Sequence, residues 1–220
     1  MYEEKINYPE ITEFLNNNLS RLHPETEAFE KELRDNETLP IIRPSAARFL
    51  QFLCALLKPK RILEIGCCVG FSAVLMKNCC PDARITTIDR YDYMIARAKE
   101  NFKRFDKEGR ITLIEGQASE ILPGLEGPYD LIFLDAAKGQ YPAFLPHCLR
   151  LLGENGVFLA DDVLFDGLVA EDSRSSRRDM TIVKRLRNFI NELNEDEGLY
   201  TSLMPIGDGM IAVMKKQEKK

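Results

Sequence analysis

The segment "YTSLMPIGDGMIAVMKK", residues 200–216, decides which fold the sequence predicts. Two runs rich in Leu, Met, Ile and Val stand on either side of "GDG". Apolar runs that are separated by so short a polar turn are typical of a β-hairpin. We therefore predict two strands at the end of the chain that are antiparallel to each other.

The chain before this hairpin alternates between strand-like and helix-like segments. Short runs rich in Ile, Leu, Val and Phe are typical of strands buried on both faces of a parallel sheet. They occupy residues 61–66, 83–89, 111–116, 129–135 and 156–162. Helical patterns occupy residues 71–80, 91–105, 118–125, 141–152 and 179–194. This alternation predicts a doubly wound α/β fold with right-handed crossovers. The hairpin adds two strands, so we predict a mostly parallel seven-stranded sheet with helices on both faces. This Rossmann-like arrangement resembles that of class I methyltransferases more than that of a plain dehydrogenase.

The length and composition set the outer limits of the interpretation. A chain of 220 residues can bury one substantial core, so we predict one domain at residues 41–216. A helical extension at residues 1–40 precedes it and a frayed tail at residues 217–220 follows. The net charge of -5 gives no global attraction for nucleic acid. The six cysteines include no C-x-x-C, which favours reduced thiols over disulfides or zinc. The start has no basic region followed by an apolar stretch, and no segment is long enough to cross a bilayer, so we predict a cytoplasmic protein without membrane contact.

Glycines and polar residues stand at the ends of the first three predicted strands, where open α/β sheets bind ligands. They are Glu64, Gly66, Gly70, Ser72, Asp89, Gly116, Gln117 and Ala118. The glycines let a ligand approach the backbone, and Asp89 is placed to accept hydrogen bonds from a ribose diol. Because Cys68 interrupts the G-x-G-x-x-G pattern, a pyrophosphate has no cradle. A ribose, an adenine and an amino-acid group without a diphosphate describe S-adenosylmethionine. The alternative is an ordinary turn, with Asp89 capping the next helix.

Acidic residues end the next two strands. Asp135 ends the fourth strand, and Asp161 and Asp162 end the fifth. Because these ends can lie side by side, we expect the carboxylates to converge, and their repulsion calls for a cation, for which Mg²⁺ is the default. Alternatively, Asp162 faces solvent, since neighbouring strand residues point to opposite faces. Lys138 is predicted to act as a general base if a metal and a sulfonium lower its pKa; the alternative is a surface lysine paired with an acid.

Three segments carry a resemblance to a known family. "LEIGCCVGFS" (63–72), "DAAKGQY" (135–141) and "LADDVLFDGLV" (159–169) resemble the cation-dependent O-methyltransferases, the family of catechol and caffeoyl-CoA methyltransferases. The resemblance covers the chain from about residue 40 onward. It implies that Asp135, Asp161 and Asp162 hold the metal and that Lys138 accepts the hydroxyl proton. It also implies a cofactor pocket bordered by Glu64, Ser72, Asp89, Gln117 and Asp135.

Position 162 departs from the family pattern. The family usually has Asn where this chain has Asp162. The additional carboxylate would bind an ion more tightly, and it would raise the pKa of Lys138, which works against a role as a base.

The acceptor must offer two adjacent oxygens to chelate a metal, as a catechol does and as 5-hydroxyuridine does with its 5-hydroxyl and O4. "DAAKGQY", "VLFDGLVAE" (163–171) and "PIGDGMIAV" (205–213) are similar to the bacterial tRNA 5-hydroxyuridine methyltransferases, which make 5-methoxyuridine at the wobble position. Basic residues after the aspartate pair could hold the phosphates of a tRNA anticodon loop, or could be an ordinary solvated helix face. They are Arg174, Arg177, Arg178, Lys184, Arg185 and Arg187.

These observations predict Mg²⁺-dependent methylation of wobble 5-hydroxyuridine by S-adenosylmethionine. The first alternative is an O-methyltransferase acting on a small catechol or a related phenol. The second is a non-catalytic protein that binds the cofactor. The resemblance also implies a homodimer, built through the N-terminal helices and the hairpin.

Overall fold

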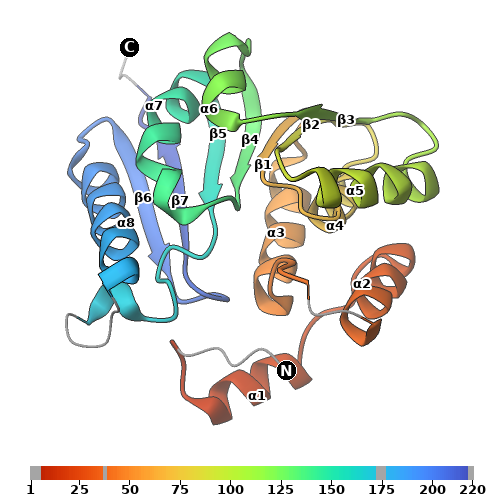
Figure 1. Ribbon diagram of the computed structural model, residues 1–220, viewed down its shortest axis with the longest axis horizontal. Coiled ribbons are helices and arrows are strands. Elements are labelled where there is room, and N and C mark those ends of the chain that lie inside the picture. Colours follow the sequence, from red (N-terminus) through yellow and green to blue (C-terminus); the bar gives the residue numbers. More distant parts are fainter. Residues whose placement is uncertain (1–5, 37–38, 172–176, 218–220) are drawn as a thin grey trace.

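The computed structural model describes residues 6–36, 39–171 and 177–217, and it shows a central sheet with helices on both faces (Figure 1). The strands are β1 (Arg61–Ile65), β2 (Arg84–Asp89), β3 (Ile111–Glu115), β4 (Tyr129–Leu134), β5 (Leu152–Ala160), β6 (Leu199–Met204) and β7 (Met210–Lys215). The α-helices are α1 (Pro9–Asn17), α2 (Pro24–Asn36), α3 (Pro44–Leu57), α4 (Phe71–Cys79), α5 (Asp92–Phe105), α6 (Ala118–Ile121), α7 (Tyr141–Leu151) and α8 (Arg177–Glu195). Three 3-10 helices are η1 (Leu122–Gly124), η2 (Lys138–Gln140) and η3 (Leu168–Ala170).

The seven strands form one sheet in the order β3-β2-β1-β4-β5-β7-β6. The first five strands are parallel, and β7 runs antiparallel to both β5 and β6. The predicted mostly parallel sheet with a C-terminal antiparallel hairpin is therefore confirmed. The strand order reverses between β1 and β4, so the carboxyl ends of these two strands form the crevice in which such sheets bind ligands.

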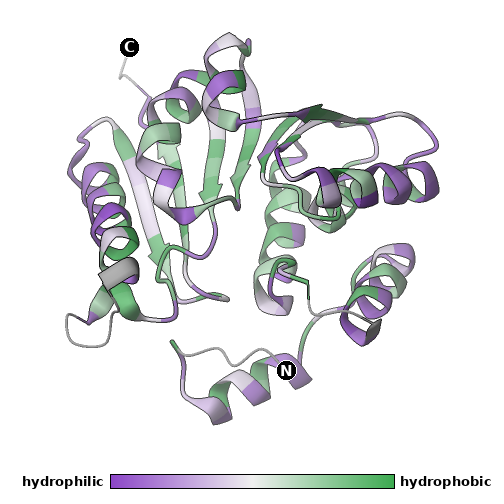
Figure 2. Ribbon diagram, viewed as in Figure 1, coloured by the Kyte–Doolittle hydropathy of each residue, from purple (hydrophilic) through white to green (hydrophobic). Residues whose placement is uncertain are grey.

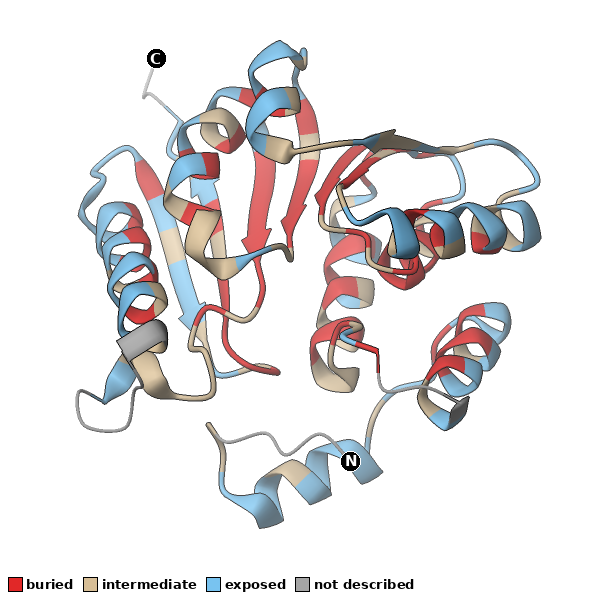
Figure 3. Cartoon of the chain, viewed as in Figure 1, coloured by how far each residue is buried: buried red, intermediate tan, exposed pale blue. Residues whose placement is uncertain are grey.

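Two apolar layers cover the faces of the sheet, and successive residues of one strand belong to different layers. Leu131 and Phe133 of β4 pack with α2, α3 and α4, whereas Ile132 and Leu134 pack with α7 and α8. This alternation is the period of two that a strand imposes. The central strands are apolar and buried, and the outer side of α8 is hydrophilic (Figures 2 and 3). Within the described ranges, no helix combines the length and the apolar character that crossing a bilayer requires.

The two N-terminal helices differ in how they contact the domain. Phe29 of α2 is buried, with its ring centroid 5.8 Å from that of Phe71 and 4.5 Å from that of Phe105. α2 therefore contributes to the core of the domain. α1 has no buried residue among those described and lies on the outside of the molecule (Figure 3).

β5 begins at Leu152, four residues earlier than the sequence predicts. Two glycines allow this early start because a side chain there would meet the neighbouring strand. A Cβ at Gly156 would lie 2.7 Å from the carbonyl oxygen of Tyr129, and one at Gly153 would lie 3.2 Å from it. The expected helix at 118–125 is also divided into α6 and η1, because Pro123 lies in its second turn and has no N–H to donate.

Candidate active site

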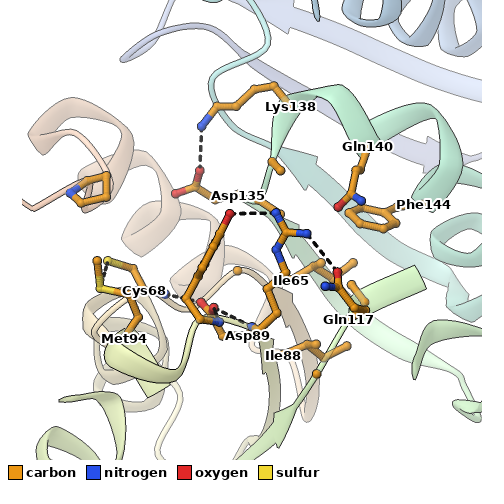
Figure 4. Close-up of a pocket in the computed structure, with 18 of the residues that line it drawn as sticks. Ile65, Cys68, Ile88, Asp89, Met94, Gln117, Asp135, Lys138, Gln140 and Phe144 are labelled. Carbon is orange, nitrogen blue, oxygen red and sulfur yellow. Dashed lines mark hydrogen bonds and ion pairs between the residues drawn. The ribbon is translucent and has the colours of Figure 1, made fainter. Parts of the chain in front are cut away.

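A cavity of about 490 Å³ opens at the carboxyl ends of β1 to β4 (Figure 4). Six residues predicted to bind the cofactor line it, namely Gly66, Asp89, Gly116, Gln117, Ala118 and Asp135. The other three predicted cofactor residues, Glu64, Gly70 and Ser72, are not among the residues that line it.

The turn after β1 requires glycine at two positions. Gly66 has a φ of +95°, and a Cβ there would lie only 2.1 Å from the carbonyl oxygen of Asp135. Gly70 has a φ of +84°, and a Cβ there would lie 2.5 Å from the ring of Phe102. Both glycines therefore act by letting the turn pack tightly, and Gly66 joins the cofactor cavity directly to the strand end that carries Asp135.

Asp89 organises the backbone around the cavity. Its Oδ2 accepts hydrogen bonds from the N–H groups of Cys67 (3.1 Å) and Cys68 (2.9 Å). Its Oδ1 accepts hydrogen bonds from the N–H groups of Arg90 (2.7 Å) and Tyr91 (3.0 Å). A carboxylate offers about four acceptor sites, so a ribose diol would share these oxygens with the backbone. These bonds hold the turns before α4 and α5, but they do not cap α5, whose N-cap residue Tyr91 makes no side-chain capping bond.

Arg90 was not singled out from the sequence, although it lines the same cavity. Its Nη1 donates to Oε1 of Gln117 at 3.0 Å, the dashed contact that ends on Gln117 in Figure 4. Its Nη2 donates to the hydroxyl of Tyr91 at 2.7 Å. Arg90 therefore links the ends of β2 and β3 across the mouth of the cavity. Its place directly after the strand-ending Asp89 was the sequence signal that could have identified it.

Glu64 and Ser72 are buried and are not among the residues that line the cavity, so their contact with the cofactor stays a prediction. Glu64 is fully buried, and its Oε2 accepts a hydrogen bond from the hydroxyl of Thr87. Its Oε1 has no hydrogen-bond partner among the described residues, and burial raises the pKa of Glu64 to about 7. A buried acceptor without a donor is a place where a donor of a bound cofactor fits.

Lys138 lies among the acidic residues that follow β4 and β5. Its Nζ is 2.6 Å from Oδ2 of Asp162 and 3.6 Å from Oδ1 of Asp135, the contact drawn in Figure 4. Asp161 is 1% exposed, and its Oδ1 accepts the N–H of Asp162 at 2.8 Å. Its carbonyl oxygen accepts the hydroxyl of Tyr141 at 2.9 Å. The ends of β4 and β5 thus meet, as predicted, beside the cofactor cavity.

Comparison with known proteins identifies the family. The family model described as "O-methyltransferase" matches residues 22–216. This protein belongs to the O-methyltransferase family. The methyltransferase is 33% identical over 188 residues to an O-methyltransferase of Aspergillus thermomutatus, covering 80% of this chain and 79% of that protein. It is 30% identical over 175 residues to the catechol O-methyltransferase of Mycobacterium tuberculosis, covering 78% of this chain and 79% of that protein. A solved structure of an SAH-bound methyltransferase of Podospora anserina is 30% identical and superimposes with a TM-score of 0.84 over 94% of each chain.

The family confirms that the chain is an S-adenosylmethionine-dependent enzyme, and the cavity at the strand ends remains the predicted site of this cofactor. The sequence resemblance to the family of catechol and caffeoyl-CoA methyltransferases is therefore confirmed as a family relationship. The interpretation as a non-catalytic binding protein loses its basis.

The charged side chains at the ends of β4 and β5 shift one another's pKa values. Burial raises the pKa of Asp135 to about 6, although the ammonium of Lys138 opposes this. Burial and the charges of Asp162 and Asp135 raise the pKa of Asp161 well above its usual range. Burial disfavours a charge on Lys138, but the carboxylates of Asp135 and Asp162 outweigh burial and raise its pKa. The carboxylate of Asp162 thus acts on the pKa of Lys138 in the direction that the sequence predicts, and the lowering expected from a metal and a sulfonium stays a prediction.

Asp135, Asp161 and Asp162 do not form a cluster of metal ligands in this structure. Within the described ranges, no three His, Cys, Asp or Glu side chains are grouped so that they could hold an ion. Asp135 and Asp162 instead meet on the ammonium of Lys138, and Asp161 turns one oxygen to the backbone. The ammonium of Lys138 thus compensates part of the negative charge of Asp135 and Asp162. The donor set of carboxylate oxygens nevertheless suits a hard divalent ion.

The structure describes the side chains of only some of the residues that were predicted to contact RNA. Arg174 lies outside the described residues, as do the side chains of Arg177 and Arg178 at the start of α8. Nη1 of Arg185 donates to the carbonyl oxygen of Gly139 at 2.9 Å, and Nε of Arg187 donates to that of Val169 at 2.8 Å. These two arginines therefore hold loops next to the active site, and Lys184 is exposed.

Proposed function

We propose that this methyltransferase transfers the methyl group of S-adenosylmethionine to one of two adjacent oxygens on a small catechol-type phenol. The observation that carries the proposal is the position of Asp135 and Lys138 on the wall of the cofactor cavity. An acceptor that reaches these two residues also reaches the cofactor. The catechol O-methyltransferase of Mycobacterium tuberculosis, a relative over more than three quarters of the chain, supports this class of acceptor.

The reaction forms an O–C bond and breaks the S–C bond of the sulfonium, so the acceptor oxygen must lose its proton and attack in line with the leaving sulfur. Lys138 is held in the charged form by Asp135 and Asp162. A charged Lys138 binds the deprotonated oxygen through a charge-assisted hydrogen bond. It becomes a proton acceptor only when the two carboxylates are neutralised.

A magnesium ion is part of the proposal. Asp135, Asp161 and Asp162 would hold it through carboxylate oxygens, and it would supply Lewis-acid activation of the acceptor hydroxyl. It would also neutralise the carboxylates that hold the pKa of Lys138 high.

Wobble 5-hydroxyuridine in tRNA is the second candidate acceptor, because its 5-hydroxyl and O4 present the same pair of oxygens. Its support is the resemblance of three segments that border the active site, residues 135–141, 163–171 and 205–213. Against it, Arg185 and Arg187 bind backbone carbonyls of the protein itself. The small phenol is therefore the first choice.

One methyl-transfer experiment separates these acceptors. Labelled S-adenosylmethionine is offered with catechol, with phenol, or with tRNA from a bacterium that lacks its own wobble methyltransferase, each with Mg²⁺ or EDTA. We expect label on catechol only, lost with EDTA and in Asp135→Ala. Label recovered as 5-methoxyuridine would move the function to tRNA. Full transfer in EDTA would remove the metal from the proposal, and equal transfer to phenol would remove the requirement for adjacent oxygens.

A homodimer and a cytoplasmic location remain predictions. α1 exposes Ile11, Phe14 and Leu15, the kind of apolar side chains that an interface would cover. Sedimentation of the purified protein, with Phe14→Ser as the variant, would measure the dimer, and cell fractionation would test the location.

A further inference from the structure

The turn between β6 and β7, residues 205–209, is bonded to the segment that follows the aspartate pair, residues 162–167. The N–H of Val163 donates to the carbonyl oxygen of Gly209 at 3.0 Å, and the N–H of Leu164 donates to that of Asp208 at 2.9 Å. The N–H of Asp166 is bonded to both carboxylate oxygens of Asp208, at 2.7 Å and 2.9 Å. Three backbone donors of one segment thus end on two residues of the hairpin turn.

The segment that donates these bonds has an unfavourable backbone. Asp162, Phe165 and Asp166 have φ values of +56°, +49° and +53°, a left-handed conformation that side chains other than glycine rarely adopt. Such a backbone persists only where the surrounding structure holds it in place. The hairpin turn is the part of the structure that does so here.

The turn is shaped for this close contact. Gly209 has a φ of +86°, and a Cβ there would lie 2.3 Å from Cγ of Leu164. Asp208 is only 5% exposed. Nη2 of Arg43, which precedes α3, lies 3.4 Å from Oδ1 of Asp166 and 3.9 Å from Oδ2 of Asp208. A carboxylate this buried is costly unless it is bonded, and its bonds here go to the segment that carries Asp162.

We propose that Asp208 is a positioning residue for the aspartate pair: by holding the left-handed segment 162–167, it keeps the carboxylate of Asp162 directed at Lys138. The proposal deepens the proposed function and rests on it where metal binding is concerned. Asp208 itself contacts neither the acceptor nor the methyl group. Its effect on the active site passes through the backbone of Asp166 and its neighbours.

The test compares Asp208→Ala and Asp208→Asn with a matched control. Asp208→Asn keeps one oxygen that can accept the N–H of Asp166, and Asp208→Ala keeps none. The control is Asp130→Ala. It removes a carboxylate that accepts the N–H groups of Lys60 (2.7 Å) and Arg61 (2.9 Å) near the amino ends of β1 and β4, away from the active site. Both aspartates bind backbone, but only Asp208 does so beside the site.

Three quantities are measured: amide hydrogen exchange in residues 158–171, binding of Mn²⁺ to the S-adenosylhomocysteine-bound protein by electron paramagnetic resonance, and the affinity for S-adenosylhomocysteine. We expect Asp208→Ala to speed exchange in this segment and to weaken Mn²⁺ binding roughly 10- to 100-fold, the usual effect of removing a group that orients a ligand. The cofactor affinity should stay within about twofold, because Asp208 is not among the residues that line the cavity. Asp208→Asn should recover most of the loss. Asp130→Ala should lower the melting temperature and leave exchange in this segment and Mn²⁺ binding unchanged.

Unchanged exchange and unchanged Mn²⁺ binding in Asp208→Ala would overturn the proposal, as would an equal change in Asp130→Ala. If Asp208→Ala does not fold, a wild-type-like Asp208→Asn supports the role of the accepting oxygen, and an Asp208→Asn that matches wild type in exchange but loses Mn²⁺ binding overturns it. If the wild-type protein binds no Mn²⁺, the metal part of the proposed function fails. Exchange in residues 158–171 then decides the positioning role by itself.

Discussion

The two halves of the active site are held together in different ways. In the cofactor half, at the ends of β1 to β3, Asp89 accepts four backbone N–H groups, and the bonds between side chains join Arg90 to Gln117 and Glu64 to Thr87. In the acceptor half, after β4 and β5, charged side chains bind one another, with Lys138 between Asp135 and Asp162. Removing a backbone-bonded group loosens one turn, whereas removing one member of a charged group leaves its partners buried and unpaired. We therefore expect changes in the first half to affect binding and stability, and changes in the second half to affect the chemistry.

The largest effect is expected where the halves touch. Gly66→Ala would place a methyl group 2.1 Å from the carbonyl oxygen of Asp135, at a φ of +95°. Displacing this backbone should lower the free energy of unfolding by about 3 kcal/mol or more and abolish cofactor binding. Urea unfolding and calorimetric titration with S-adenosylhomocysteine measure both. Gly124→Ala is the control, since a Cβ there meets no described atom within 4 Å. Near-normal binding in Gly66→Ala would show that the halves are independent.

Lys138→Met should separate chemistry from cofactor binding. We expect kcat to fall roughly 10²- to 10⁴-fold, the range for loss of a group that handles the reacting proton. Affinity for S-adenosylhomocysteine should change little, because Lys138 forms its contacts with the acceptor half. Lys60→Met, an exposed lysine paired with Asp82, serves as the control. A loss of cofactor affinity as large as the loss of kcat would mean that Lys138 holds the cofactor instead.

Asp162→Asn tests the electrostatic balance inside the acceptor half. The carboxylate of Asp162 helps to raise the pKa of Lys138, so removing its charge should lower that pKa. If deprotonated Lys138 accepts the acceptor's proton, the rising limb of kcat/KM against pH should move to lower pH in Asp162→Asn. It should stay in place in Asp162→Glu, which keeps the charge. A limb that does not move in Asp162→Asn would show that another group titrates.

The contrast between the halves also explains what the sequence could reveal. The alternation of strands and the "GDG" hairpin predicted the sheet, because buried parallel strands and a tight turn each leave a local pattern. The topology then placed Asp89, Asp135 and Asp161 at strand ends, because parallel strands end at the same edge. These parts of the site could be predicted because they depend on position along a strand.

Side-chain pairing could not be predicted in the same way. That Lys138 binds Asp162, and that Glu64 accepts the hydroxyl of Thr87, depends on rotamers and on packing between distant segments. The bonds that the N–H of Asp166 donates to Asp208 join residues 42 positions apart. Arg90 carried a signal only through its neighbour Asp89. The place of a residue along its strand predicted where its side chain lies. The structure was needed to learn which side chains bind each other.

The smallest expected effect concerns Glu64, the buried carboxyl of the cofactor half that is only partly hydrogen-bonded. Burial raises its pKa to about 7 from an ordinary value of 4.5. Between these two pH values the folded protein holds a proton that the unfolded chain has released, so the Glu64 contribution to stability is present at low pH and is lost as pH rises toward 7. Glu64→Gln removes this loss while keeping an oxygen for the hydroxyl of Thr87. The variant should therefore gain stability relative to wild type from pH 4.5 to 7 and gain no more above it.

Urea unfolding at half-unit steps of pH measures this difference, whose slope corresponds to at most one proton, about 1.4 kcal/mol per pH unit. Glu126→Gln, at an exposed position, should run parallel to wild type. If Glu64→Gln also runs parallel, Glu64 is ionised in the folded protein. Its unpaired Oε1 would then be a buried charge, and the cofactor half would resemble the acceptor half in depending on a cation to balance it.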